Sequence, residues 1–232
     1  MDNFIKNIYF DYSLPKNLSL NVVTINNYKY FLKNIYSNVH QYNDTTISIA
    51  FLGPMGTYSH LATLTYIKNF FFKKKIFNIS CNSFTEIFFY MEKNIINFAI
   101  VPIENNCSGI INKVNTLLKN SSLKIHYEFE IPIKHCLITY TKYNNINNIH
   151  EIFSHAEPFK QCSLFINKHP LWKKHFCNST AAAIKKISIF KSQNFAAIGN
   201  KKTAELYKLN IIKTYPISNK INNKTKFLVL KK

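Results

Sequence analysis

Short apolar segments alternate with amphipathic helical stretches from residue 47 to the end of the chain, and this alternation restricts the fold most strongly. Apolar strands separated by helix-length stretches are typical of an α/β fold with a largely parallel sheet. A chain of 232 residues can also bury a sizeable core, in one domain of two lobes or in two small domains. The strand candidates are 47–52, 76–81, 98–101, 133–139, 149–154, 195–198 and 227–230.

Two groups of polar residues predict where helices begin. Ser83 and Glu86 have the spacing of a capping box, in which a serine accepts from a backbone N–H three residues later. Asn178, Ser179 and Thr180 offer N-caps for a helix over 181–187. The first 46 residues differ in character, because they are rich in Asn, Tyr and Ile and show little periodicity. We therefore predict a separate appendage at 1–46 before a domain at 47–231.

The formal net charge of +19 raises the question of a nucleic-acid partner. All thirty basic residues are lysines, and they are spread along the chain without a recognisable nucleic-acid-binding module. A biased codon composition explains this charge at least as well, so we expect no nucleic-acid partner. The apolar runs are too short to span a membrane, and the first residues do not resemble a signal peptide. These features predict a cytoplasmic protein without a membrane partner.

The five cysteines are odd in number and far apart in the sequence. None of them forms the close C-x-x-C spacing of a zinc or redox site. We therefore expect reduced thiols and no metal site, although Cys107 and Cys162 fall near the loops described next, where a reactive role stays open.

Glycine is scarce, so the positions of the four glycines are informative. Gly53 and Gly56 follow the first strand candidate, and Gly109 closes a loop after the candidate at 98–101. Both loops join the carboxyl end of a strand to the start of a helix, where ligands bind in open α/β sheets. Backbone N–H groups at such a junction can hold an anion without arginine. Plain turns are the alternative interpretation.

Two further strand-to-helix junctions carry polar side chains. One contains Ser154, His155 and Gln161, and the other contains Ser179 and Thr180. Each of these residues also has an ordinary structural role open to it, such as a helix N-cap. The G-x-S-x-G motif of a hydrolase nucleophile is absent. The residues alone therefore indicate an anion-binding cleft in an α/β protein and do not support a hydrolase triad.

Six segments in this order resemble the prephenate dehydratase family, in particular the dehydratase region of bifunctional chorismate mutase-prephenate dehydratases. The likeness covers about residues 47–231. The segments are IAFLGPMGTYSHLA from Ile49, FAIVPIENNCSGIIN from Phe98, FSHAEPFKQCSLFI from Phe153, STAAA from Ser179, AAIGN from Ala196 and NKTKFLVL from Asn223.

The resemblance implies a fold of two α/β lobes, similar to a periplasmic-binding-protein fold, with the active-site cleft between them. One lobe is expected at about 47–123 and 205–230, and the other at about 124–204. The implied function is conversion of prephenate to phenylpyruvate, water and carbon dioxide in phenylalanine biosynthesis. The expected partner is the small molecule prephenate, no cofactor is implied, and the oligomeric state stays open between a monomer and a homo-oligomer.

The same resemblance implies roles for particular residues. Thr225 matches the threonine of the family's T-R-F motif, which is essential for dehydration. Its hydroxyl is expected to position the leaving oxygen or to relay a proton to it, with Glu104 and His155 as titratable sources. The catalytic candidates are Thr225, Asn105, Ser154 and Gln161. The substrate-binding candidates are Thr57, Glu104, Ser108, His155, Ser179, Thr180 and Lys226.

The chain also departs from the family's pattern. Lys226 stands where the family has arginine, so the charge is kept but the bidentate fork is lost, and reduced affinity or turnover is expected if this residue meets substrate. Relatives continue into a regulatory ACT domain after the position of Leu230, so control through that domain is not expected here. Residues 1–46 are too short for a chorismate mutase, and we interpret them as a remnant of a lost mutase or a linker.

Two other classes of function stay open beside the enzyme. A two-lobed protein that binds a ligand without turnover would keep the same cleft, but the retained Thr225 favours catalysis. A basic nucleic-acid-binding protein would show salt-dependent binding to generic DNA and would leave the six segments unexplained.

Overall fold

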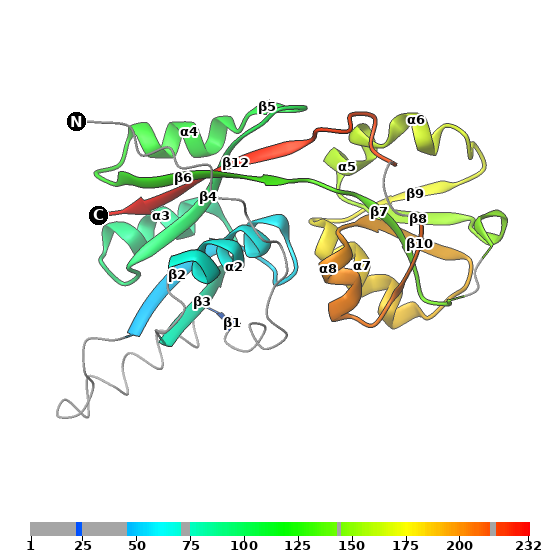
Figure 1. Cartoon of the computed structure of the whole chain (residues 1–232), viewed down its shortest axis with the longest axis horizontal. Coiled ribbons are helices and arrows are strands. Elements are labelled where there is room, and N and C mark those ends of the chain that lie inside the picture. The colour runs from blue at the N-terminus through cyan, green and yellow to red at the C-terminus, as the bar shows by residue number, and fades with distance from the viewer. Residues whose placement is uncertain (1–21, 25–45, 71–74, 143–144, 214–216) are drawn as a thin grey trace.

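The computed structural model of the protein describes residues 22–24, 46–70, 75–142, 145–213 and 217–232. These residues form two lobes, each built on its own β-sheet with helices on both faces (Figure 1). The two-lobed α/β fold expected from the sequence is therefore confirmed. Within the described ranges, no helix combines the length and the apolar character needed to cross a membrane.

The first lobe contains a mixed sheet with the strand order β1-β3-β2-β4-β12-β6, and β5 pairs with β4 outside this path. Its first four strands are parallel, whereas β12 runs antiparallel to both β4 and β6. The strands are β1 Val22–Thr24, β2 Thr46–Leu52, β3 Lys75–Cys81, β4 Phe98–Asn105, β5 Gly109–Ile110, β6 Lys124–Pro132 and β12 Lys224–Lys231. The helices are α2 Tyr58–Phe70, α3 Phe84–Glu92 and α4 Asn112–Lys119.

The core of the first lobe lies on both faces of its sheet. Ile49 and Ala50 are neighbours in β2, and successive side chains of a strand point to opposite faces. Ile49 belongs to the apolar cluster that contains Tyr66 of α2, while Ala50 belongs to the cluster that contains Ile87 and Met91 of α3. A strand buried on both faces needs a nearly continuous apolar run, which explains why β2 was recognisable in the sequence.

The second lobe contains a smaller sheet with the strand order β11-β7-β10-β8-β9. Strands β10, β8 and β9 are parallel, and β7 runs antiparallel to both of its neighbours. Helices α5 and α6 pack on one face and α7 and α8 on the other. The elements are β7 Cys136–Thr139, the 3-10 helix η2 Ile146–Asn148, β8 Glu151–Ser154, α5 Ala156–Gln161, α6 Ser163–Ile166, β9 Lys173–Phe176, α7 Thr180–Phe190, β10 Phe195–Gly199, α8 Lys201–Leu206 and β11 Asn210–Lys213.

Every strand candidate overlaps an observed strand, but two expectations need correction. The sheets are mixed rather than largely parallel, because β12 and β7 run against their neighbours. Strands β1, β5, β6, β9 and β11 were not predicted, because charged residues interrupt the apolar residues of β6 and the other four each contain at most two apolar residues. In β6 only Phe129 and Ile131 are buried, which leaves a weak signal for a strand.

The lobe boundaries also differ from the expected ones. Strand β6 pairs along β12, so 124–132 belong to the first sheet, and β11 pairs with β7, so 210–213 belong to the second. The two sheets are thus formed within 46–132 and 224–231, and within 136–213, besides β1. Strand β1 pairs in parallel with β3 and is an edge of the first sheet, although it lies inside the predicted appendage. The remainder of 1–45 lies outside the described residues.

Both predicted helix starts are confirmed. The Ser83 hydroxyl accepts from the backbone N–H of Glu86 at 3.1 Å, and the Glu86 carboxylate accepts from the backbone N–H of Asn82 at 2.6 Å. Ser179 caps α7 by accepting from the backbone N–H of Ala182 at 3.0 Å. These contacts satisfy N–H groups that have no partner inside the helix.

Candidate active site

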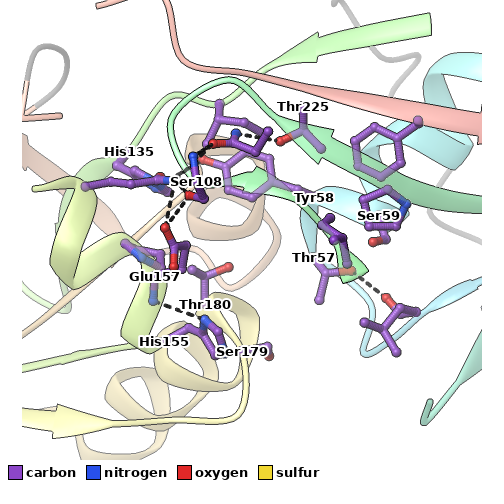
Figure 2. Close-up of a pocket in the computed structure, with 18 of the residues that line it drawn as sticks. Thr57, Tyr58, Ser59, Ser108, His135, His155, Glu157, Ser179, Thr180 and Thr225 are labelled. Carbon is purple, nitrogen blue, oxygen red and sulfur yellow. Dashed lines mark hydrogen bonds between the residues drawn. The ribbon is translucent and has the colours of Figure 1, made fainter. Parts of the chain in front are cut away.

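A cavity of about 450 Å³ lies between the two lobes and receives side chains from both (Figure 2). Its volume falls in the usual range for a small-molecule site. Polar side chains reach it from the strand ends and helix starts of the first lobe and from α5 and α7 of the second. Those residues are Thr57, Ser59, Asn105, Ser108, Thr225, His155, Glu157, Gln161, Ser179 and Thr180.

Thr225 and Asn105 face each other across neighbouring strands. They are register partners in β12 and β4, and the Asn105 Nδ2 donates to the Thr225 Oγ1 at 2.9 Å. The Asn105 Oδ1 accepts from the backbone N–H groups of Cys107 and Ser108, which fixes the orientation of this amide. Among the described contacts the Thr225 hydroxyl only accepts, so its own proton is left for a ligand in the cavity.

The same amide begins a network that crosses between the lobes. The Asn105 Nδ2 also donates to the Asn223 Oδ1 at 2.7 Å, and the Asn223 Nδ2 donates to the Gln161 Oε1 at 2.9 Å. The Gln161 Nε2 then donates back to the Ser108 hydroxyl at 2.9 Å. Gln161 ends α5 in the second lobe, so these amides join the lobes at one wall of the cavity.

His135 lies on the 133–135 connection, where the chain first passes from one lobe to the other, and its side chain is almost fully buried. Its Nε2 is 2.9 Å from the Gln161 Oε1, and its Nδ1 is 3.3 Å from the Tyr58 Oη. The Tyr58 hydroxyl is also placed to donate to the Lys134 carbonyl at 2.9 Å. Burial lowers the pKa of His135 and raises the pKa of Tyr58 well above its usual value, so burial favours the neutral form of both groups.

Two helices begin at the cavity from opposite lobes. Thr57, Tyr58 and Ser59 line it at the start of α2, and Ser179 and Thr180 line it at the start of α7. The first N–H groups of a helix have no intrahelical partner, and the helix dipole adds a partial positive charge there. Both starts are therefore suited to bind anionic groups.

A second contact between the lobes involves the glycine-rich loop before α2. Gly56 has a φ of 90°, a backbone conformation that side-chain-bearing residues rarely adopt. Its carbonyl accepts from the Asn200 Nδ2 at 2.9 Å and from the Thr203 hydroxyl, both in the second lobe. A Cβ at Gly56 would lie 2.8 Å from the Thr203 Cγ2, so glycine also allows this close approach.

The sequence profile of prephenate dehydratase matches residues 49–232. The chain belongs to the prephenate dehydratase family. A relative, the bifunctional chorismate mutase/prephenate dehydratase of Buchnera aphidicola subsp. Schizaphis graminum, is 40% identical over 191 residues, which are 81% of this chain and 49% of the relative. The prephenate dehydratase of Methanocaldococcus jannaschii is 35% identical over 180 residues, which are 77% of this chain and 62% of the relative. The chain thus spans about half the length of the bifunctional relatives.

A solved structure of the family has the same fold. The crystal structure of the prephenate dehydratase from Staphylococcus aureus subsp. aureus Mu50 superimposes with a TM-score of 0.67 at 26% identity. The likeness covers 80% of this chain and 66% of that one. Membership of the prephenate dehydratase family therefore explains both the two-lobed fold and the six sequence segments named above.

Most candidates that the family resemblance singled out meet at the cavity, and three do not. The Ser154 hydroxyl is fully buried and donates to the Ile198 carbonyl at 2.8 Å, inside the second sheet. Glu104 is exposed and is the register partner of Lys226, whose Nζ lies 3.8 Å from the Glu128 carboxylate. Strand alternation explains this placement, because the neighbours of Glu104 and Lys226 point into the cavity. The candidates that line the cavity are Thr57, Asn105, Ser108, His155, Gln161, Ser179, Thr180 and Thr225.

Several residues of this dehydratase-family site were missed in the sequence. Tyr58 and Ser59 directly follow Thr57 in the glycine-rich loop, so the loop itself was a signal for them. Glu157 lies two residues after His155 and accepts from the Ser108 hydroxyl across the cavity. His135 offered no local signal, because it stood inside an apolar segment that was predicted as a strand.

Proposed function

We propose that this chain is a prephenate dehydratase that converts prephenate to phenylpyruvate, carbon dioxide and water in the synthesis of phenylalanine. Membership of the family supports this function. The observation that carries it is the Thr225 hydroxyl, which is buried beside the cavity, held by Asn105 and left with a free proton among the described contacts.

The reaction requires little of the protein beyond binding the substrate and orienting it. The prephenate dianion and one proton give the phenylpyruvate anion, carbon dioxide and water. The bond between the ring and its carboxylate breaks, its electron pair enters the ring, and the ring hydroxyl leaves as water. The ring becomes aromatic, which supplies the driving force, and no electron carrier is consumed. The protein must hold two carboxylates and assist the leaving oxygen.

Thr225 is the group that we assign to the leaving oxygen. Because its Oγ1 already accepts from Asn105, its proton is directed to another acceptor, and a leaving hydroxyl in the cavity is such an acceptor. An aliphatic hydroxyl is a weak acid, so Thr225 orients and stabilises the leaving oxygen, while a more acidic group or water supplies the proton. The Asn105 amide, held by two backbone N–H groups, keeps the hydroxyl in place.

The two helix starts are the sites that we assign to the carboxylates of prephenate. The N-termini of α2 and α7 enter the cavity from opposite lobes, which suits a ligand with two separated anionic groups. The apolar side chains of Ile133 and Phe227 also line the cavity and offer a surface for the ring.

The test is an assay of the purified chain with prephenate, in which phenylpyruvate formation is followed by absorbance. Turnover above the spontaneous rate is expected, with a large loss in Thr225→Val, which keeps the shape of the side chain and removes the hydroxyl. Thr65→Val is the matched control, because the Thr65 hydroxyl is buried but bonds only to the Leu61 carbonyl of its own helix among the described contacts. Absence of turnover in the wild type would exclude the proposed function.

We also propose that the protein works in the cytoplasm without nucleic-acid or membrane partners. The five cysteines are all free thiols, as expected in a reducing compartment. Burial raises the pKa of Cys162 to about 12, which argues against a reactive thiolate at this position.

A further inference from the structure

The cavity has less positive charge than its proposed ligand requires. The chain contains thirty lysines and no arginine, yet none of the described residues that line this cavity is a lysine. Lys160 and Lys220 instead line a smaller adjoining cavity of about 350 Å³. Two helix starts provide roughly half a positive charge each. The Glu157 carboxylate also lines the cavity, and its negative charge offsets part of that positive charge. A dianion would therefore keep at least about one uncompensated negative charge.

The amide network determines which ring nitrogen of His135 carries the proton. The two backbone N–H groups held by Asn105 fix its amide orientation, and this fixes Asn223 and then Gln161 in turn. The Gln161 Oε1 must therefore face His135 as an acceptor. The neutral imidazole then carries its hydrogen on Nε2 and leaves a lone pair on Nδ1.

The Nδ1 side of the same ring has room for a second proton. The Tyr58 hydroxyl has one hydrogen but two acceptors, the His135 Nδ1 at 3.3 Å and the Lys134 carbonyl at 2.9 Å. With a neutral imidazole, only one of these contacts is a full hydrogen bond. A proton on Nδ1 would donate to the Tyr58 Oη, and Tyr58 would then donate to Lys134. The imidazolium thus satisfies every contact around this ring without any side-chain movement.

We propose that His135 takes up a proton when the anionic substrate enters the cavity, and that its imidazolium provides the missing positive charge. This inference rests on the proposed function, because it concerns the same ligand in the same cavity. His135 acts here as a binding and positioning residue. Carbon dioxide leaves as a neutral molecule and the leaving hydroxyl takes up a proton to become water, so the product has one negative charge where the substrate had two. The need for the imidazolium therefore falls after the reaction, and release of the product becomes easier.

The groups that surround His135 are consistent with this change of charge. Within the protein itself, burial is the main influence and lowers the pKa of the His135 imidazole, whereas the Gln161 hydrogen bond and the Glu157 charge raise it. Tyr58 on α2 contributes only its hydroxyl, because burial and the nearby Cys136 and Cys162 raise its pKa well above the usual value. A ligand dianion would be the largest new charge near the ring, and opposite charge favours the protonated form.

The experiment compares kcat/KM with kcat between pH 6.5 and 8.5, a range in which carboxylates stay ionised. The profile of kcat/KM reports groups of the free enzyme, and that of kcat reports the complex. If the free enzyme must gain a proton, kcat/KM of the wild type falls by up to about tenfold per pH unit while kcat changes much less. In His135→Gln the slope of kcat/KM disappears, and its value at pH 6.5 drops below that of the wild type.

His155→Gln is the matched control, because it removes the other imidazole that lines the cavity. The slope should persist in this variant, since among the described contacts the His155 ring bonds only to the Glu157 backbone N–H and not to the amide network that contacts His135. A slope that survives His135→Gln overturns the inference, and so does a flat wild-type profile with normal turnover. Absence of phenylpyruvate at every pH would overturn the proposed function itself.

A second measurement does not depend on the folding of a variant. The enthalpy of binding of benzylsuccinate, an unreactive dianion with a phenyl ring and two carboxylates, to the wild type is measured at pH 7.5 in two buffers with different ionisation enthalpies. The difference gives the number of protons taken up per bound ligand. Uptake approaching one proton supports the inference, and a value of zero overturns it.

Discussion

The two sides of the cavity differ in chemistry. The first lobe contributes the uncharged hydroxyls and amides of Thr57, Ser59, Asn105 and Thr225, which strand ends and a helix start hold in place. The carboxylate and the imidazoles come from the start of α5, as Glu157 and the N-cap His155, and from the connection between the lobes, as His135. One side is thus suited to fix the geometry of a ligand and the other to adjust the charge around it.

Removal of the hydroxyl from the first side should have the largest effect. We expect Thr225→Val to lower kcat by at least about a hundredfold, because single hydrogen-bond donors to developing charge are commonly worth that much. Single-turnover rates measure this loss, and circular dichroism shows whether the variant is folded. A folded variant with wild-type turnover would show that the neutral side does not assist the leaving oxygen.

Acid should destabilise the first lobe through His60, a buried histidine of α2. Burial lowers the pKa of His60 to about 4, and its Nδ1 accepts from the Gly56 N–H, so a second proton would break this bond. The unfolded chain binds the proton near pH 6.5, so stability is present above that pH and is lost as pH falls toward 4. We expect the free energy of unfolding to drop by about 2 kcal/mol between pH 7 and pH 5.

Urea unfolding at the two pH values measures this drop in the wild type and in His60→Gln. The variant should be less stable at pH 7 but should lose less stability on acidification. An equal loss in both proteins would show that other groups cause the acid sensitivity.

The second lobe should respond to Ser154→Ala mainly in stability. This buried hydroxyl donates to the Ile198 carbonyl between β8 and β10, and its loss leaves a buried acceptor without that partner. We expect a cost of about 1–2 kcal/mol in the free energy of unfolding. Urea denaturation is the measurement, with Ser188→Ala as a control, because this half-buried hydroxyl bonds only to the Lys185 carbonyl of its own helix among the described contacts. Unchanged stability would contradict the structural role of Ser154.

The smallest effect is expected at Lys226, which is next to Thr225 but points away from the cavity. Its ion pair with Glu128 is 3.8 Å long and about half exposed, and such pairs contribute at most about 1 kcal/mol. We expect Lys226→Gln to change kcat/KM by less than about twofold, because the substitution leaves the side chains that line the cavity unchanged. A large rise in KM would show that Lys226 contacts the substrate after all, as the T-R-F resemblance suggested.

Much of the site could be predicted because its residues lie in short recognisable segments. Asn105, Gln161 and Thr225 were all identified through such segments, and all three line the cavity. Glu104 was grouped with the site as a titratable residue and Lys226 as the residue at the position of the family's arginine, and each is next to a residue that does line the cavity. A segment does not show which of two adjacent side chains faces a ligand, because this depends on strand pairing and on the twist of the sheet.

The sequence by itself determined the alternation of strands and helices, the caps at Ser83 and Ser179 and the family, since these depend on residues close together in the chain. Only the tertiary structure decided the direction of β12, the sheet to which β6 belongs and the position of His135. The bond between Asn105 and Asn223 joins residues 118 positions apart. Such contacts form because packing of whole sheets brings the residues together, and no local periodicity encodes them.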